Sequence, residues 1–151
     1  MKTLASNKRA TFDYDILEEF EAGLVLKGYE VKSIKTGRMS LRGSYVTIKD
    51  REAYLLNAHV PAYQPKNTPE SYDPDQTRKL LLKKRELKRL VGKIKERGLT
   101  LVPLRVYNNK SGRLKLEFGV GKGRRKPDKR EMIKKREAER KIGRAVRGRI
   151  E

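Results

Sequence analysis

Residues 44–58, SYVTIKDREAYLLNA, contain two short apolar runs separated by a charged turn. The runs at 45–48 and 53–56 are rich in aromatic and aliphatic side chains, whereas residues 49–52 are Lys, Asp, Arg and Glu. Two such runs joined by a short polar connection predict an antiparallel β-hairpin. We therefore expect a fold assembled largely from strands that pair with their neighbours in the chain.

A second hairpin and a further strand are predicted on either side of this stretch. Residues 99–107 and 114–120 flank a turn at 108–112, whose asparagines and glycine suit the positive φ angles of such connections. Residues 12–26 begin with apolar and charged side chains in alternation, which is typical of a strand. Ala22-Gly23 then predicts a bend in that strand.

Two helices and one long loop complete the predicted body. Residues 28–37 are expected to form a short helix because their apolar side chains fall on one side. Residues 61–75 contain four of the six prolines and predict a long loop. At the end of this loop, Asp73-Pro74 supplies helix-start signals, so a strongly basic helix is predicted over 78–97, ending at Gly98.

These elements favour a mainly β fold class. Five or six short strands, mostly in hairpins, with two or three helices, are typical of a small closed or nearly closed barrel of the oligonucleotide-binding type, the OB-fold. Periodicity alone also fits an α+β sandwich, so that alternative stays open on this evidence.

Residues 121–151 differ from the first 120 in composition. Leu, Ile, Val and Phe make up 32 of the first 120 residues but only 4 of the last 31. A segment with so few apolar side chains cannot offset the entropy cost of ordering its backbone. We therefore predict a folded barrel at 1–120 and a basic tail at 121–151, which becomes ordered only on a partner.

The net charge indicates the kind of partner. Among 151 residues there are 39 Lys and Arg but only 19 Asp and Glu, which gives a net charge of +20. Residues 76–97 hold ten basic and two acidic side chains, and the tail holds fourteen and five. This distribution predicts that a polyanion binds at least two surfaces. Nucleic acid is favoured over a membrane because no basic segment has a bulky apolar face.

Several function classes are disfavoured by what the sequence lacks. The chain has no cysteine, which excludes disulfides and thiol catalysis. No secretion signal or membrane-spanning run is found, so we expect the chain in the cytoplasm. The single histidine, His59, is expected to be a structural or surface residue. No nucleophile motif, metal cluster or phosphate-binding loop is found, and Gly119, Gly121 and Gly123 are interpreted as a hinge or linker.

Two residues of the predicted helix 28–37 are candidates for RNA recognition. The ring of Tyr29 offers a stacking or ribose contact. The carboxylate of Glu30 is of the type that accepts hydrogen bonds from base amino groups and repels phosphates. Such an acid would favour specific over indiscriminate binding.

Short blocks distributed along nearly the whole chain resemble, in order, the signatures of one known family. The blocks are Asn7-Lys8-Arg9-Ala10, Phe20-Glu21-Ala22-Gly23-Leu24, Gly28-Tyr29-Glu30-Val31-Lys32-Ser33, Thr77-Arg78-Lys79-Leu80-Leu81-Leu82, Gly119-Val120-Gly121-Lys122-Gly123 and Asp128-Lys129-Arg130. They resemble the SsrA-binding protein family, also called small protein B. Several blocks in register make the resemblance specific.

The resemblance implies a non-enzymatic OB-type barrel that works without a cofactor. It implies binding to the tRNA-like domain of transfer-messenger RNA in trans-translation, the bacterial rescue of stalled ribosomes. The basic tail is then expected to become helical in the empty mRNA channel, near the decoding centre of the small-subunit rRNA. Contact with elongation factor Tu and alanyl-tRNA synthetase, through the RNA, is implied as well.

Two sets of residues are predicted to carry these contacts. The predicted RNA-binding residues of the body are Asn7, Lys8, Arg9, Tyr29, Glu30, Lys32, Arg78, Lys79 and Lys122. The residues predicted to contact the ribosome near the decoding centre are Asp128, Lys129, Arg130, Lys134, Lys135 and Arg136.

The sequence departs from the family pattern at three positions. Pro127 stands where many relatives have histidine, and Ala138 where many have tryptophan, so two aromatic contacts of the tail are missing. Phe12 replaces a histidine found in some relatives. A structural ribosomal protein, equally small and basic, is the main alternative on composition. An RNA-modifying enzyme is a more distant one.

Overall fold

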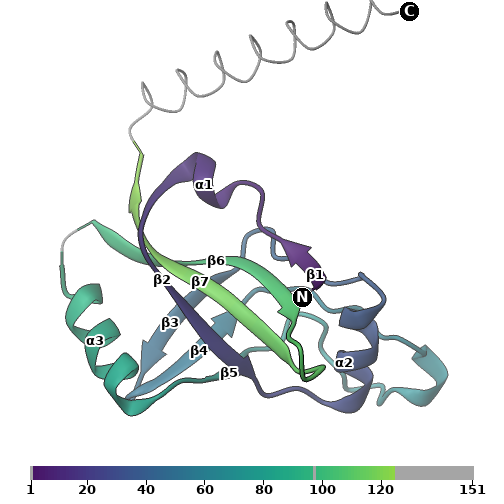
Figure 1. Cartoon of the computed structure of the whole chain (residues 1–151). Helices are drawn as coiled ribbons and strands as arrows, with labels where there is room; N and C mark the ends of the chain where they lie inside the picture. Colours follow the sequence, from purple (N-terminus) through teal and green to yellow (C-terminus); the bar gives the residue numbers. More distant parts are fainter. Residues whose placement is uncertain (1, 97, 125–151) are drawn as a thin grey trace, which may run out of the picture.

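The computed structural model of the chain describes residues 2–96 and 98–124 and shows seven strands and three helices in that part (Figure 1). The strands are β1 (Lys2–Ser6), β2 (Tyr14–Leu24), β3 (Tyr45–Lys49), β4 (Glu52–Leu56), β5 (Arg78–Leu81), β6 (Leu99–Asn108) and β7 (Leu114–Gly123). The helices are α1 (Ala10–Asp13), α2 (Gly28–Lys35) and α3 (Lys84–Ile94), with a 3-10 turn at Pro65–Asn67.

The strands form one antiparallel sheet that closes on itself. Their order is β1-β6-β3-β4-β5-β2-β7, and β7 pairs again with β6, which completes a ring. The predicted mainly β barrel of OB type is confirmed by this closure, and the α+β sandwich is set aside. Closure leaves only β1 outside the ring, paired with the far end of β6.

The core fills the barrel and is closed by a helix at each end. Phe20 of β2 and Phe118 of β7 stack with ring centroids 5.7 Å apart. Figure 1 shows α3 and α2 at the left and right ends of the barrel. Leu90 of α3 and Ile34 of α2 are fully buried in the same core cluster, so each helix packs an apolar side chain into one end of the barrel.

Both predicted hairpins are confirmed. β3 and β4 pair from Tyr45↔Leu56 to Lys49↔Glu52, and β6 and β7 pair over almost their full lengths. The β3–β4 turn has positive φ at Asp50 (52°) and Arg51 (62°). These are the conformations that two-residue hairpin turns require, and arginine rarely adopts them.

The first part of the chain differs from the prediction. β1 was not predicted, because its sequence carries little alternation and the strand exists through its pairing with β6. The predicted strand at 12–26 begins only at Tyr14, since Phe12 and Asp13 belong to the single turn of α1. The predicted strand is otherwise confirmed as β2, which ends at Leu24, two residues before the predicted end.

The basic helix predicted over 78–97 is wrong in its first third. Residues Arg78–Leu81 form β5, in which buried and exposed side chains alternate, and the helix begins only at Lys84. β5 fills the gap between β4 and β2 in the ring. Pairing on both edges therefore overrides the helical spacing of the leucines, so Arg78 and Lys79 lie on a strand.

The interpretation of the glycines near 120 as a hinge or linker is also wrong, because all three lie within β7. Gly119 and Gly121 lie within β7 and pair with both β2 and β6. A Cβ on Gly119 would lie 2.6 Å from Cγ2 of Ile16, and one on Gly121 would lie 3.1 Å from Cβ of Tyr14. Glycine is used here because neighbouring side chains cross the strand closely.

Candidate nucleic-acid interface

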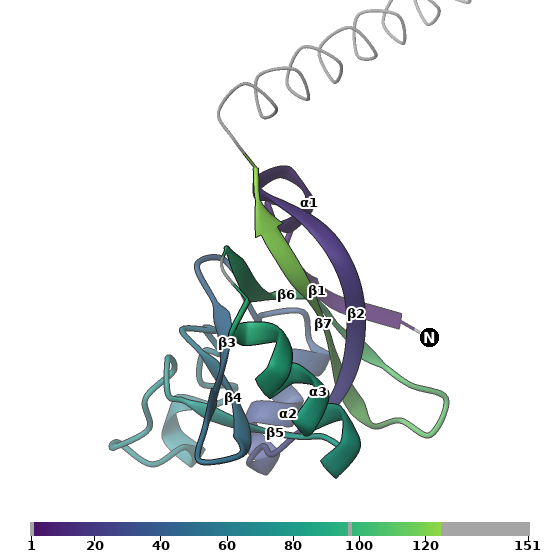
Figure 2. The same cartoon turned by 90° about the vertical axis from the view of Figure 1, so that its left-hand side faces the viewer.

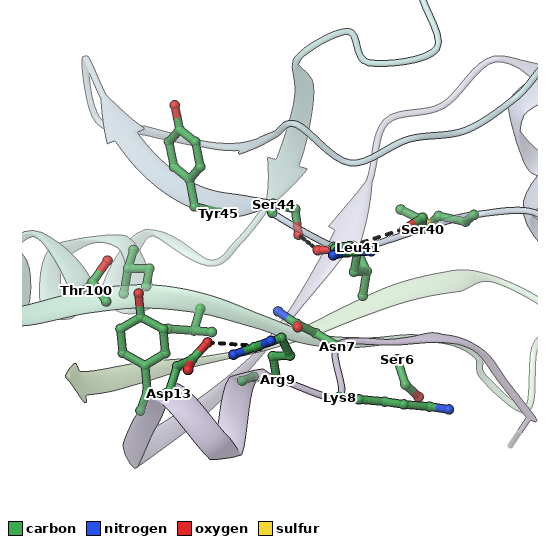
Figure 3. A pocket seen from close by; sticks show the side chains of 17 residues that line it. Ser6, Asn7, Lys8, Arg9, Asp13, Ser40, Leu41, Ser44, Tyr45 and Thr100 are labelled. Carbon is green, nitrogen blue, oxygen red and sulfur yellow. Dashed lines mark hydrogen bonds and ion pairs between the residues drawn. The ribbon is translucent and has the colours of Figure 1, made fainter. Parts of the chain in front are cut away.

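An open groove lies between the start of the chain and the barrel (Figure 3). It has a volume of about 980 Å³ and is lined by residues from three segments, at 6–14, 39–45 and 100–102. We call it the N-terminal groove. Because the three segments are far apart in sequence, only closure of the barrel brings them together.

Asn7 fastens one wall of the groove to β6. Its backbone N–H donates to the carbonyl of Leu104 at 2.8 Å, and its Nδ2 donates to the carbonyl of Pro103 at 2.9 Å. Both acceptors are backbone carbonyls of β6. Asn7 therefore has a structural role, which is to hold the turn that carries Lys8 and Arg9.

Lys8 and Arg9, on that turn, are exposed. The side chain of Arg9 is 72% exposed, with its Nε 3.6 Å from Oδ2 of Asp13 and its guanidinium 5.7 Å from the ring centroid of Phe12. An ion pair this exposed adds little to stability. The charge of this wall is consequently better suited to binding an anion than to holding the fold.

The opposite wall supplies a further cation, an aromatic ring and two hydroxyls. Arg42 and Tyr45 are exposed, the latter by 44%. Ser44 Oγ donates to the carbonyl of Leu41 at 2.6 Å, and Ser40 Oγ accepts from the N–H of Arg42 at 3.3 Å. Figure 3 shows Tyr45 on the side of the groove across from Arg9.

Cations that contact phosphates, combined with an aromatic ring on which a base stacks, are the elements of a nucleic-acid groove. Arg42 and Tyr45 were not among the predicted site residues. Arg42 lies in the polar connection before β3 and Tyr45 is the first residue of that strand, and no local pattern sets either apart as a site residue. Their placement opposite Lys8 and Arg9 depends on the pairing of β3 with β6, which sequence patterns do not reveal.

Glu30 and Arg78 form a buried ion pair away from this groove. Arg78 Nε donates to Glu30 Oε2 at 2.6 Å, and the two side chains are 1% and 2% exposed. The other oxygen of Glu30, Oε1, accepts the backbone N–H of Lys27 at 3.0 Å, at the start of α2. The carboxylate is therefore shared between the helix and β5.

The guanidinium of Arg78 also ties down the long loop at 61–77. Nη1 donates to the carbonyls of Ala58 (2.8 Å) and Gln76 (3.0 Å), and Nη2 donates to the carbonyl of Pro74 (2.9 Å) and to Oη of Tyr72 (3.3 Å). All five donor hydrogens of the group thus have acceptors within the protein. In this conformation neither Arg78 nor Glu30 presents a polar atom to a ligand.

Tyr29 and Lys32 lie close to this pair on α2. Tyr29 is half-buried, and its ring meets that of Tyr72 edge to face with centroids 5.1 Å apart. Lys32 is exposed on the next turn of the helix. The structure therefore groups Tyr29, Glu30, Lys32 and Arg78 at the α2 end of the barrel, separate from Asn7, Lys8 and Arg9.

The last two predicted body residues belong to neither group. Lys79 is exposed on β5, with its Nζ 3.0 Å from Oε1 of Glu52. Lys122 is exposed near the end of β7, level with Asp15 of β2 and Leu99 of β6. The predicted tail contacts, Asp128, Lys129, Arg130, Lys134, Lys135 and Arg136, lie outside the described residues.

A metal site and a membrane-spanning helix are both absent from the part of the chain that the structure describes. Over residues 2–96 and 98–124, no three His, Asp or Glu side chains are grouped so that they could hold a metal ion. None of the helices in these same ranges has the length and apolar character needed to cross a membrane. His59 pairs with the Asp75 carboxylate at 2.8 Å, and its backbone bridges Ser40.

Comparison with known proteins gives a consistent result over nearly the whole chain. The family described as SmpB protein matches residues 4–148. The SsrA-binding protein of Geobacillus kaustophilus is 50% identical over 148 residues, which cover 98% of this chain and 94% of that protein. The SsrA-binding protein of Thermosipho africanus is 48% identical over 142 residues, covering 94% and 95%.

A solved structure shares the fold as well. It is described as "tmRNA-SmpB: a journey to the center of the bacterial ribosome" and superposes with a TM-score of 0.66 at 44% sequence identity. The match covers 85% of this chain and 92% of the other. The similarity thus extends from the sequence to the three-dimensional arrangement.

Proposed function

The chain belongs to the SsrA-binding protein (SmpB) family, and on that premise we propose that it binds the tRNA-like domain of transfer-messenger RNA. It acts as a non-catalytic adaptor in trans-translation, delivering this RNA to stalled ribosomes in the cytoplasm. Elongation factor Tu and alanyl-tRNA synthetase meet it through the RNA.

One observation of the structure carries the RNA-binding part of this proposal. Lys8, Arg9 and Arg42 converge with the exposed ring of Tyr45 on the open N-terminal groove. Cations supply contacts to the phosphates, and the ring supplies a stacking surface for a base. Asn7 contributes by holding the turn that carries Lys8 and Arg9.

The α2 end of the barrel supplies a second contact. Tyr29 and Lys32 reach the RNA from the helix, and Glu30 and Arg78 support them from beneath. The exposed cation Lys122 adds a phosphate contact, and Lys79, whose ammonium is paired with Glu52, adds a weaker one. The burial of Glu30 favours support of the surface over a direct hydrogen bond to a base.

The tail has a different task. Its fourteen basic and five acidic residues favour binding in an RNA-lined channel. Six residues contact the small-subunit rRNA near the decoding centre: Asp128, Lys129, Arg130, Lys134, Lys135 and Arg136. When mRNA already fills the channel, the tail has no room there. The tail therefore binds only in a channel that holds no mRNA, and this is how a vacant channel is recognised.

The groove is tested by removing two charges from it and two from elsewhere. The double variant Lys8→Ala/Arg9→Ala should weaken binding of the tRNA-like domain at least about tenfold at fixed salt, because two phosphate contacts are lost. Lys110→Ala/Arg113→Ala removes the same charge from the exposed β6–β7 turn, about 25 Å along β6 from the groove. Equal losses in the two double variants would show that only net charge matters and that the groove is not the site.

The alternative of a structural ribosomal protein is tested by sedimentation. A structural component should remain on washed ribosomal subunits at one copy per subunit. An adaptor should be released by the wash and should retain transfer-messenger RNA in a pull-down from bacterial lysate. Stoichiometric retention on washed subunits without that RNA would contradict the proposed function.

A further inference from the structure

The outer surface of β3, β4 and β5 combines aromatic and basic side chains. Along β3 the residues at 45, 47 and 49 point outward, because Val46 is buried and Ile48 packs against the core. β4 and β5 alternate in the same way. We call this surface the tyrosine face, and its members are Tyr45, Thr47, Lys49, Glu52, Tyr54, Leu56 and Lys79.

The strand register places the two tyrosines as diagonal neighbours. Tyr45 pairs with Leu56, and Thr47 pairs with Tyr54, which in turn pairs with Lys79. Residues related in this way have Cα atoms about 7–8 Å apart, within reach of large side chains. The two tyrosines therefore lie on one face of the hairpin rather than at separate places.

A network of polar contacts holds the ring of Tyr54. Its hydroxyl donates to Glu52 Oε2 at 2.8 Å, and Lys79 Nζ donates to Glu52 Oε1 at 3.0 Å. The bond from Lys79 lowers the pKa of Glu52, and the bond to Glu52 raises the pKa of Tyr54. The carboxylate is thus anionic and the phenol neutral at neutral pH.

Charges of both signs gather at the hairpin-turn end of this surface. Glu52, which lies opposite Lys49, neutralises Lys79 and leaves the uncharged ring of Tyr54 nearby. The turn carries the exposed cations Lys49 and Arg51, with the exposed Asp50 between them. Arg51 keeps a φ of 62°, a conformation in which glycine would be less strained. A cation is therefore held at this turn in spite of its backbone preference.

The tyrosine face is open and continues the N-terminal groove. Figure 2 shows β3 and β4 at the left of the barrel, with α3 and α2 to their right, so neither helix lies on that side. Tyr45 belongs to both surfaces, because it lines the groove and begins β3. From there the face extends along β3 to Lys49, about 13 Å away.

We propose that the tyrosine face binds an unpaired stretch of RNA, whose bases stack on Tyr45 and Tyr54 and whose phosphates contact Lys49 and Arg51. The inference rests on the RNA-binding function proposed above and names the kind of RNA this surface takes. Tyr45 is exposed and Tyr54 is partly exposed, and stacking on these rings requires unpaired bases, since the edges and faces of paired bases are covered within a duplex.

The test compares two probes and three variants of the full chain. The probes are a 12-nucleotide oligouridylate and a 12-base-pair RNA duplex, with affinities measured by fluorescence anisotropy at fixed salt. Tyr45→Ala/Tyr54→Leu should weaken oligouridylate binding about tenfold or more and duplex binding less than about twofold. Tyr54→Phe keeps the ring and should bind like the unaltered chain. Tyr63→Leu removes a different tyrosine, one stacked near Arg38, and should also have no effect.

Two outcomes would overturn the inference: oligouridylate binding unchanged in the double variant, or a fall that is equal for both probes. Tyr45→Ala alone keeps the test valid if Tyr54→Leu disturbs folding, because Tyr45 is exposed and lies outside the core. A different result would contradict the proposed function itself. In that case the unaltered chain would bind the tRNA-like domain no more tightly than an unrelated RNA of equal length, whatever the tyrosine variants do.

Discussion

Arg9 and Arg78 show how differently one side chain is used in two regions of this molecule. Arg9, at the N-terminal groove, is 72% exposed and makes loose contacts with Asp13 and with the ring of Phe12. Arg78, at the α2 end, is 1% exposed and directs every donor to protein acceptors. In a chain with a net charge of +20, a basic residue can thus serve the fold or the ligand. Its burial, rather than its charge, decides which.

The largest effect expected from this contrast is on stability. Arg78→Met should lower the free energy of unfolding by about 3–5 kcal/mol, because it leaves the carboxylate of Glu30 buried without its cation. Urea denaturation of the full chain measures this loss. Lys79→Met, next in sequence but exposed, is the matched control and should change the midpoint far less.

A double-mutant cycle separates the pair from its surroundings. Replacing both partners, with Glu30→Leu and Arg78→Met, should cost less than the sum of the two single variants, because no uncompensated charge remains. Additive losses would mean that the loop contacts of Arg78, and not its pairing with Glu30, carry the stability.

The second effect concerns how RNA binding depends on salt. The logarithm of the affinity falls linearly with the logarithm of salt concentration, with a slope of about 0.7–0.9 per phosphate contact. Lys8→Ala/Arg9→Ala should reduce that slope by about 1.5, whereas Arg78→Lys should leave it unchanged at a temperature where the chain stays folded. A reduced slope for Arg78→Lys would place this buried arginine on a phosphate after all and would remove the contrast between the two regions.

The parts of the fold that could be predicted are those encoded by residues close together in the sequence. The two hairpins and α2 are encoded locally, by runs and turns within fifteen to twenty-five residues of each other. β1 is not, because it depends on pairing with β6 at the other end of the barrel. The leucines near 80 fit two periodicities, and only the neighbouring strands β4 and β2 decide in favour of a strand.

The site could be predicted in part for the same reason. Lys8 and Arg9 form a contiguous block and were identified, whereas Arg42 and Tyr45 reach the groove only through barrel closure. Glu30 and Arg78 are 48 residues apart, and nothing in the sequence shows that they bind each other. The prediction that Glu30 contacts a base remains untested, and its burial gives the residue a structural explanation.

A third effect extends the contrast to a buried polar group without charge. Burial and a hydrogen bond with Glu21 raise the pKa of Tyr107 to about 12. The unfolded chain loses this proton near pH 10, so the native state holds more protons between pH 10 and 12 and the stability must fall as the pH rises through that window. The part due to Tyr107 should be on the order of 1 kcal/mol.

Tyr107→Phe provides the measurement. Unfolding by urea at pH 9, 10 and 11 should show a shallower loss of stability in this variant than in the unaltered chain. The comparison cancels the titration of the lysines and of the other tyrosines, which both proteins share. Parallel curves would indicate that the hydroxyl of Tyr107 titrates normally and contributes nothing to the pH dependence.

The smallest effect is expected at Arg51, a surface cation that carries a backbone cost. Its φ of 62° is unfavourable for a residue with a Cβ and is relaxed in glycine. Arg51→Gly should therefore raise the free energy of unfolding by about 0.5–1 kcal/mol, although glycine also loses more entropy on folding. The same variant should bind oligouridylate more weakly, because a phosphate contact at the turn is lost.

Arg51→Asn is the matched control. Asparagine tolerates positive φ and restores a side chain without restoring the charge, so this variant should also be more stable than the unaltered chain and should still bind oligouridylate weakly. If instead both variants bound as tightly as the unaltered chain, the strained arginine would have no part in RNA recognition, and the edge of the tyrosine face would rest on Lys49 alone.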